Sequence, residues 1–227
     1  AAALQQAEKL LEQRLKRIPI AYLIGHKEFY GREFTVTPDT LIPRPESETI
    51  IEMATRLIDS ERWATIDEVR AIDVGCGSGC LGITLKLERP AITMTLSDIS
   101  PKALEVARQN AQQLGAPVQI IQSDLLAAVP HTASHFQLII ANLPYVDRSW
   151  PTSPELRHEP AEALYADDQG LECIKTLLRQ TPTALASSGV VILEADPCQH
   201  DEIAAYAGQH GLKTLETSDY VVVLAHA

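Results

Sequence analysis

Residues 71–80 form the run Ala71-Ile72-Asp73-Val74-Gly75-Cys76-Gly77-Ser78-Gly79-Cys80, in which a short apolar stretch leads into three alternating glycines. The glycines stand where a first buried strand would turn into a helix, and there the backbone can approach a ligand without a clash at Cβ. Asp98 follows the next predicted strand, about 20 residues beyond the loop. Because a carboxylate in that place can accept both ribose hydroxyls, the region predicts a nucleoside-binding site.

The glycines alone leave the cofactor open. Gly77, Gly79 and Gly82 also satisfy G-x-G-x-x-G, the pyrophosphate pattern of nicotinamide enzymes, and a tight turn that binds nothing is a further alternative. Asp73 favours S-adenosylmethionine, because a carboxylate would repel a pyrophosphate but suits a cationic sulfonium and an amino group. Ser123-Asp124 follows the third predicted strand, where folds of this kind contact adenine.

A repeated strand-then-helix order surrounds the loop and predicts an α/β fold with a doubly wound parallel sheet. The predicted strands are 70–74, 92–96, 118–121, 136–141 and 190–193, and the predicted helices are 80–87, 101–113, 171–185 and 199–209. The last two segments, 212–216 and 220–224, flank Thr217-Ser218-Asp219 and predict a closing antiparallel hairpin.

The first 44 residues differ from this pattern. Apolar residues at helical spacing predict a helix over 4–18 that stops before Pro19. Between Glu28 and Ile42, the order Phe29, Gly31, Phe34, Val36 and then Thr37-Pro38-Asp39 suggests two short strands joined by a turn. We therefore divide the chain into a helix-and-hairpin cap, 1–44, and a catalytic domain, 45–227, which begins with a helix after Pro45.

The composition is that of an ordinary globular protein, with 45% apolar and 22% charged residues and no run of 18 uncharged apolar residues. The net charge is −11; residues 1–44 hold seven Lys/Arg against five Asp/Glu, so residues 45–227 carry −13. Such an acidic body disfavours contact with a nucleic acid backbone. The four cysteines and seven histidines show no metal-ligand spacing, so we expect reduced thiols, a cytoplasmic location and no metal.

A second motif, Asn142-Leu143-Pro144-Tyr145, stands at the carboxyl end of predicted strand 136–141, the edge where open sheets bind ligands. A planar NH2 group is a poor nucleophile because its lone pair is delocalised, so it must be held in line with a methyl donor. The side-chain oxygen of Asn142 and the carbonyl of Leu143 can accept its two N–H bonds. Pro144 fixes the backbone and Tyr145 offers a flat packing face. A plain turn after a buried strand is the structural alternative.

Taken in order, these motifs resemble S-adenosylmethionine-dependent methyltransferases, and the whole chain resembles the release factor glutamine N5-methyltransferase family, PrmC or HemK. The resemblance covers nearly all of the chain. Besides the glycine loop and the tetrad, it rests on residues 19–25, Glu28-Phe29, residues 41–48, Glu159-Pro160-Ala161, Ala163-Leu164 and Gly170-Leu171. Pro43-Arg44-Pro45-Glu46 is the most discriminating stretch, because many methyltransferases share the glycine loop.

This resemblance implies a seven-stranded, mostly parallel, Rossmann-like sheet behind a helical docking domain, of which residues 1–44 would be the end. It implies methyl transfer to the glutamine of a Gly-Gly-Gln loop in bacterial peptide chain release factors, in translation termination. The implied acceptor-binding and catalytic residues are Asn142, Leu143, Pro144 and Tyr145, with Arg44, Glu46 and Glu48 at the entrance. The expected cofactor-binding residues are Asp73, Gly75, Cys76, Gly77, Ser78, Gly79, Asp98, Asp124, Leu125 and Asn142.

Two positions depart from the family pattern. The family usually has Asn-Pro-Pro-Tyr, and Leu143 replaces the first proline, which keeps the carbonyl acceptor but restores an N–H group and backbone freedom. Leu125 stands where the family often has an aromatic residue beside adenine, so it offers only apolar contact.

Leu143 keeps other functions open, because Asn-Leu-Pro-Tyr is also the form in ribosomal RNA adenine N6-dimethyltransferases. That family predicts a basic RNA-binding face, whereas this chain is acidic. A DNA adenine methyltransferase would need a recognition domain. Asn142 argues against a non-catalytic module that only binds the cofactor. A nicotinamide oxidoreductase would leave the Asn-Leu-Pro-Tyr tetrad without a role.

Overall fold

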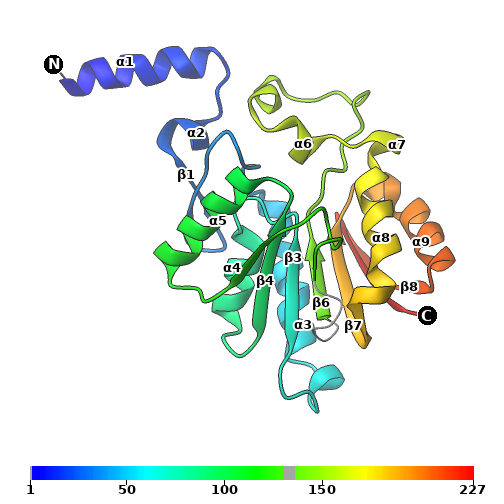
Figure 1. Ribbon diagram of the computed structural model, residues 1–227. Helices are drawn as coiled ribbons and strands as arrows, with labels where there is room; N and C mark the ends of the chain where they lie inside the picture. The colour runs from blue at the N-terminus through cyan, green and yellow to red at the C-terminus, as the bar shows by residue number, and fades with distance from the viewer. Residues whose placement is uncertain (1, 130–135) are drawn as a thin grey trace.

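The computed structural model describes residues 2–129 and 136–227. Its centre is a seven-stranded sheet with the order β5-β4-β3-β6-β7-β9-β8 (Figure 1). The strands are β3 (Arg70–Val74), β4 (Thr93–Asp98), β5 (Gln119–Gln122), β6 (Phe136–Ala141), β7 (Leu185–Glu194), β8 (Leu212–Ser218) and β9 (Val221–His226). β9 pairs antiparallel with both β7 and β8, and the other described pairs in this sheet are parallel. The predicted mostly parallel sheet with a C-terminal hairpin is confirmed.

Helices cover both faces of the sheet. Side chains alternate along each strand, so that Ala71 packs with one apolar cluster and its neighbour Ile72 with another. The first cluster includes residues of α3 (Glu48–Ile58), α4 (Cys80–Glu88) and α5 (Pro101–Leu114), and the second includes residues of α8 (Glu172–Ala184) and α9 (His200–Gln209). Strands buried on both faces explain why the central segments are almost wholly apolar.

The first helix, α1 (Ala2–Leu15), ends before the residue that the sequence predicted and extends away from the rest of the molecule (Figure 1). Arg17 is left-handed (φ 68°), its N–H donates to the Arg14 carbonyl, and the Ile18 N–H donates to the Gln13 carbonyl. This is a Schellman motif, which ends a helix locally even though apolar spacing continues to Ile18.

After α2 (Ile20–Ile24), an antiparallel hairpin is formed by β1 (His26–Phe29) and β2 (Arg32–Thr35). The turn is Tyr30-Gly31, both with positive φ, and the Thr37-Pro38-Asp39 segment follows the second strand. Phe29 and Phe34 meet edge to face with ring centroids 6.2 Å apart and join the cluster beneath α3, α4 and α5. The hairpin therefore shares the core of the sheet, while a domain boundary at 44/45 stays a prediction.

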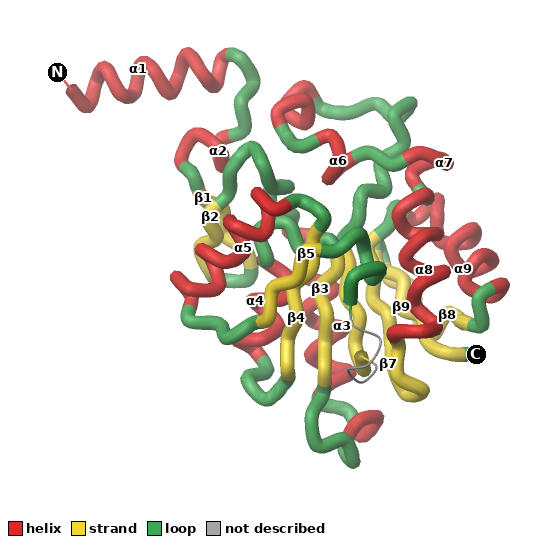
Figure 2. The backbone as a smooth tube through the Cα atoms, in the orientation of Figure 1, coloured by secondary structure: helices red, strands yellow, loops and turns green. Residues whose placement is uncertain are grey.

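Short elements complete the path and several lie near the carboxyl edge of the sheet (Figure 2). They are η1 (Pro45–Ser47), η2 (Glu61–Trp63), η3 (Pro154–His158), α6 (Ala161–Leu164), α7 (Asp167–Gly170) and η4 (Pro197–Gln199). Within residues 2–129 and 136–227, no helix combines the length and apolarity that crossing a membrane requires.

Replacing Phe34 with Ala tests whether the hairpin belongs to the core. Phe34 is fully buried, so we expect Phe34→Ala to lower the free energy of unfolding by about 3–5 kcal/mol in urea titrations. Leu11→Ala, at a side chain 60% exposed on α1, should change it by less than about 0.5 kcal/mol. Equal effects of the two substitutions would contradict the shared core.

Candidate functional site

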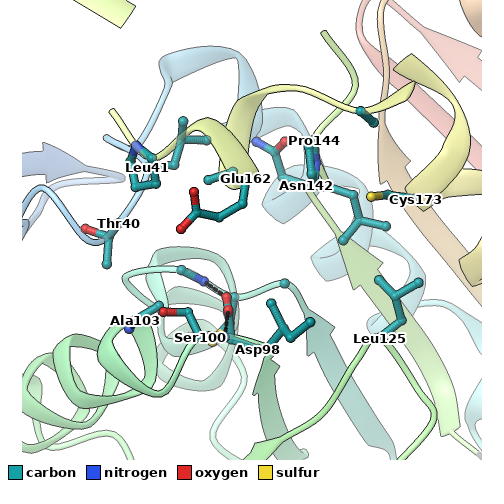
Figure 3. A pocket seen from close by; sticks show the side chains of 18 of the residues that line it. Thr40, Leu41, Asp98, Ser100, Ala103, Leu125, Asn142, Pro144, Glu162 and Cys173 are labelled. Atoms are coloured by element: carbon teal, nitrogen blue, oxygen red, sulfur yellow. Dashed lines mark hydrogen bonds between the residues drawn. The ribbon is translucent and has the colours of Figure 1, made fainter. Parts of the chain in front are cut away.

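The carboxyl ends of β3 and β6 lie side by side where the strand order reverses. Val74 and Ala141 are register partners, so the glycine loop and the Asn-Leu-Pro-Tyr tetrad begin at the same level. A cavity of about 540 Å³ lies at this edge (Figure 3), within the roughly 300–1,000 Å³ of small-molecule sites. Among the residues that line it are Arg44, Gly75, Cys76, Gly77, Ser78, Asp98, Asp124, Leu125, Asn142, Leu143 and Pro144.

The glycine loop is shaped for close backbone approach. Gly77 has φ 53°, and a Cβ atom there would meet no atom within 4 Å, so the space beside it is open to a ligand. Gly75 has φ 71°, and its Cβ would lie 2.7 Å from Leu143 Cδ2. The absence of a side chain at Gly75 therefore lets loop and tetrad pack directly. Gly79 is the N-cap of α4 and does not line the cavity.

Asp98, at the end of β4, is held by the loop that it faces. Its Oδ2 accepts the Gly77 N–H at 2.9 Å and its Oδ1 accepts the Ser100 N–H at 2.8 Å. Burial raises the pKa of Asp98, and these backbone donors oppose that rise. Each oxygen keeps acceptor capacity, so the carboxylate fits the ribose hydroxyls of the expected nucleoside cofactor.

The expected adenine side of the cavity combines one carboxylate with apolar side chains. Asp124 and Leu125 line it, and Leu125 adopts a left-handed conformation (φ 50°). Ile99, which the sequence did not single out, also lines it and is 59% exposed. An isoleucine directly after Asp98 with so much exposed surface offers an apolar contact for a planar base, and its position after the strand was the available signal.

Asp73 lies beneath the cavity and does not line it. The side chain is fully buried, its Oδ2 accepts the Gly82 N–H at 2.8 Å, and its Oδ1 has no hydrogen-bond partner. Burial raises the pKa of Asp73 to about 7. In this structure the carboxyl group fixes the first turn of α4 beneath the glycine loop, and it does not present itself to a sulfonium directly.

Asn142 connects the cavity with a buried polar group that sequence reasoning missed. Its Nδ2 donates to Ser47 Oγ at 3.0 Å, and Ser47 Oγ donates to Glu194 Oε2 at 2.5 Å. Ser47 and Glu194 are each 2% exposed. A carboxylate directly after the apolar residues 190–193 was the one signal in the sequence, because glutamates are seldom fully buried without partners.

Tyr145 points away from this cavity. Its hydroxyl donates to Glu194 Oε1 at 3.0 Å, and its backbone carbonyl accepts the Gln199 Nε2 amide at 2.9 Å. A Cβ on Gly170 would lie 2.0 Å from that carbonyl oxygen, so only glycine fits there. The turn of the tetrad is thus held by residues that do not line the first cavity. Tyr145 lines a second cavity instead.

The two segments that set the resemblance apart meet in an ion pair. Arg44 Nη2 lies 2.6 Å from Glu159 Oε1, and Glu159 Oε2 accepts the Ile42 N–H at 3.0 Å. Glu46 is exposed and lines neither cavity, whereas Glu48 accepts the Tyr30 N–H at 3.0 Å. Arg44 alone of the three expected entrance residues lines the site.

Several residues between 147 and 168 form one side of the cavity. Glu162, Ala163 and Tyr165 line it, and Figure 3 shows Glu162 projecting into the space opposite Asp98. The second cavity, of about 450 Å³, lies between this segment, Arg44 and Tyr145. Residues between 147 and 168 therefore line both cavities.

The first cavity is acidic. Six carboxylate residues and two arginines line it, namely Asp39, Asp98, Asp124, Glu162, Asp167, Glu172, Arg44 and Arg148. Such a field favours a cationic ligand over an anionic one. The open space at Gly77, the free acceptor capacity of Asp98 and this charge together fit S-adenosylmethionine better than a dinucleotide pyrophosphate.

Cys76 and Cys80 line the cavity. Burial raises the pKa of the Cys76 thiol and raises that of Cys80 to about 12, so both stay neutral. In residues 2–129 and 136–227, no group of three His, Cys, Asp or Glu side chains could hold a metal ion. His131 and His135 lie outside the described residues.

Comparison with known proteins identifies similar chains. The methyltransferase small domain family matches residues 47–159. A release factor glutamine methyltransferase from Neisseria gonorrhoeae is 37% identical over 216 residues, 93% of this chain and 76% of that protein. One of the same name from Escherichia coli is 34% identical, over 92% of this chain and 75% of that protein.

A solved structure of a methyltransferase from Pyrococcus furiosus is also similar in fold. It has a TM-score of 0.61 at 18% identity and covers 93% of this chain and 96% of that one. At that identity the likeness supports the fold alone.

Removing Arg44 should destabilise the protein, because the Glu159 side chain is 2% exposed and would lose its charge partner. We expect Arg44→Ala to cost about 3 kcal/mol in urea unfolding, and Arg44→Met combined with Glu159→Gln to recover part of that loss. Lys102→Ala removes an exposed partner of Asp39 and should cost less than about 1 kcal/mol. An Arg44→Ala protein as stable as Lys102→Ala would show that Arg44 does not stabilise the buried Glu159 carboxylate.

Asp73→Asn tests the buried carboxyl through pH. Its pKa of about 7 in the folded chain exceeds the value of about 3.9 in an unfolded chain, so the native state binds the extra proton between those values. The stability that this proton confers is complete below pH 4 and declines as the pH rises to 7. The unfolding free energy of Asp73→Asn minus that of wild type should therefore increase across this window and then level off.

The control for this pH series is Asp59→Asn, because Asp59 is an exposed carboxylate whose pKa is lowered by its hydrogen bond to Arg89. Its difference from wild type should not increase between pH 5 and 7. A flat difference for Asp73→Asn over the same range would show that Asp73 is not protonated in the folded protein.

Proposed function

The chain belongs to the release factor glutamine methyltransferase family, and we propose that it methylates the side-chain amide nitrogen, N5, of a glutamine in a peptide chain release factor. The observation that carries this proposal is the placement of Asn142 on a cavity that also holds Asp98 and the glycine loop. We expect the target to be the glutamine of a Gly-Gly-Gln loop. The four free cysteines support a cytoplasmic site of action.

The donor side of the cavity fits S-adenosylmethionine, which supplies an electrophilic methyl group on a positively charged sulfur. The backbone at Gly75 and Gly77 would pass over its methionine part, and Asp98 would accept hydrogen bonds from the ribose. Asp124, Leu125 and Ile99 would surround the adenine. The acidic lining would favour this cation over its neutral product.

On the acceptor side of the cavity, the tetrad would orient an amide nitrogen that is a poor nucleophile on its own. Asn142 Oδ1 and the Leu143 carbonyl would accept the two N–H bonds of the glutamine side chain, which aims the nitrogen lone pair at the methyl group. Two oxygens so placed also stabilise positive charge that develops on nitrogen. Leu143 is buried against Gly75, so its packing supplies rigidity that a proline would otherwise give.

Transfer would be direct, with no bond between enzyme and methyl group. The amide nitrogen forms its new bond to carbon while the carbon–sulfur bond breaks, and the nitrogen then loses its proton to water. The thiols of Cys76 and Cys80 stay neutral, and Asp73 does not line the cavity. Orientation and electrostatics would therefore provide the rate enhancement, without a general base acting before transfer.

The proposal is tested by methyl transfer from labelled S-adenosylmethionine. The acceptors are an intact bacterial release factor, the same factor with its Gly-Gly-Gln glutamine replaced, and ribosomal RNA. We expect label on the intact factor alone, located by mass spectrometry on that glutamine. Label on RNA would support an adenine methyltransferase, and binding of the cofactor without label would support a non-catalytic module; either would contradict the proposal.

Asn142→Ala should lower kcat by roughly 10²–10³-fold, the effect of removing one preorganised polar group around a developing charge. The Kd of S-adenosylmethionine, measured by calorimetry, should change far less than kcat. Gln112→Ala on an exposed position of α5 serves as control and should match wild type. A wild-type kcat in Asn142→Ala would show that the tetrad does not hold the acceptor.

A further inference from the structure

Glu194 is a buried carboxylate that the reaction described above does not use. It ends β7, the neighbour of β6 in the sheet, and it lines neither cavity. Each of its two carboxylate oxygens accepts a hydrogen bond from a hydroxyl group: Oε2 from Ser47 at 2.5 Å and Oε1 from Tyr145 at 3.0 Å. Burial raises the pKa of Glu194, while the hydroxyls of Ser47 and Tyr145 and the amide of Asn142 oppose that rise.

The hydrogen atoms in this cluster can be assigned by counting donors. Ser47 has one hydroxyl hydrogen, and an ionised Glu194 can only accept, so that hydrogen is directed to Glu194. Toward Asn142, Ser47 Oγ then has only lone pairs. Asn142 must therefore present its NH2 group to Ser47, at 3.0 Å, and its Oδ1 is directed the other way.

This assignment matters because the two ends of a carboxamide have nearly the same shape but opposite hydrogen-bonding roles. An Asn142 turned by 180° would direct its NH2 group at the NH2 group of a glutamine. Two donors would then face each other, and the acceptor that aims the lone pair would be lost.

We propose that Glu194 is a positioning residue that acts through Ser47 to keep the Oδ1 atom of Asn142, and not its NH2 group, facing the acceptor. This inference rests on the proposed function. The three residues come from distant parts of the chain, η1, the end of β6 and the end of β7. The relay therefore also couples the Pro-Arg-Pro-Glu-Ser segment to the tetrad.

Glu194→Gln tests the relay with almost no change in size. A glutamine can donate an N–H to Ser47 Oγ, which frees the Ser47 hydrogen to point at Asn142 and allows the amide to turn. We expect kcat with a release factor to fall by about 10²-fold. The KM for the factor and the Kd of S-adenosylmethionine should stay within about threefold of wild type, and so should those of the control Glu216→Gln, an exposed glutamate paired with Arg56.

Ser47→Ala removes the middle of the relay and provides a second measurement. Ser47 and Glu194 act in series. The kcat of the Ser47→Ala/Glu194→Gln protein should therefore be about the same as that of the less active of the two single variants. Independent structural roles would make the losses multiply and would also lower Tm in proportion. Losses that multiply would overturn the relay.

The outcomes separate this inference from the proposed function. If wild type transfers no methyl group to a release factor, the proposed function fails. If wild type transfers the group and Glu194→Gln keeps a wild-type kcat, the proposed function stands and the relay is overturned. Should Glu194→Gln not fold, Ser47→Ala decides: a lowered kcat with an unchanged cofactor Kd supports the relay, and a wild-type kcat overturns it.

Discussion

The site depends on the parallel pairing of β3 with β6 in the middle of the sheet. These strands are separated in sequence by β4 and β5, and their pairing places Val74 beside Ala141. Each strand then delivers its loop to the same edge, the glycines from one and Asn142 from the other. Without this register, Asp98 and the oxygen atoms of Asn142 and Leu143 would not share one cavity.

Rigidity at the tetrad comes from groups outside the cavity. Glu194 holds the hydroxyls of Ser47 and Tyr145, Gln199 holds the Tyr145 carbonyl, and Gly170 leaves room for that carbonyl. Burying a carboxylate is costly unless its hydrogen bonds are satisfied, and both oxygens of Glu194 have a hydroxyl donor. The family pattern has its first proline where this chain has Leu143, and Leu143 is buried against Gly75 in the same region.

Local patterns in the sequence predicted much of this molecule. The strand–helix order, the loop at Gly75–Gly79, Asp98 and the tetrad all follow from residues close together in the chain, and the structure confirms the fold that they imply. Long-range pairs could not be predicted in the same way. The partners Ser47 and Glu194 are 147 residues apart, and Arg44 and Glu159 are 115 apart. Asp73 illustrates the same limit, because its spacing suits a cofactor contact while its burial, visible only in three dimensions, directs it to Gly82.

The most direct measurement is a crystal structure of the protein with S-adenosylhomocysteine and a release factor. We predict that the side-chain nitrogen of the Gly-Gly-Gln glutamine lies about 2.7–3.2 Å from Asn142 Oδ1, with the NH2 group of Asn142 directed at Ser47 Oγ. A glutamine nitrogen bound elsewhere in the cavity, or an Asn142 side chain released from Ser47 in the complex, would contradict it.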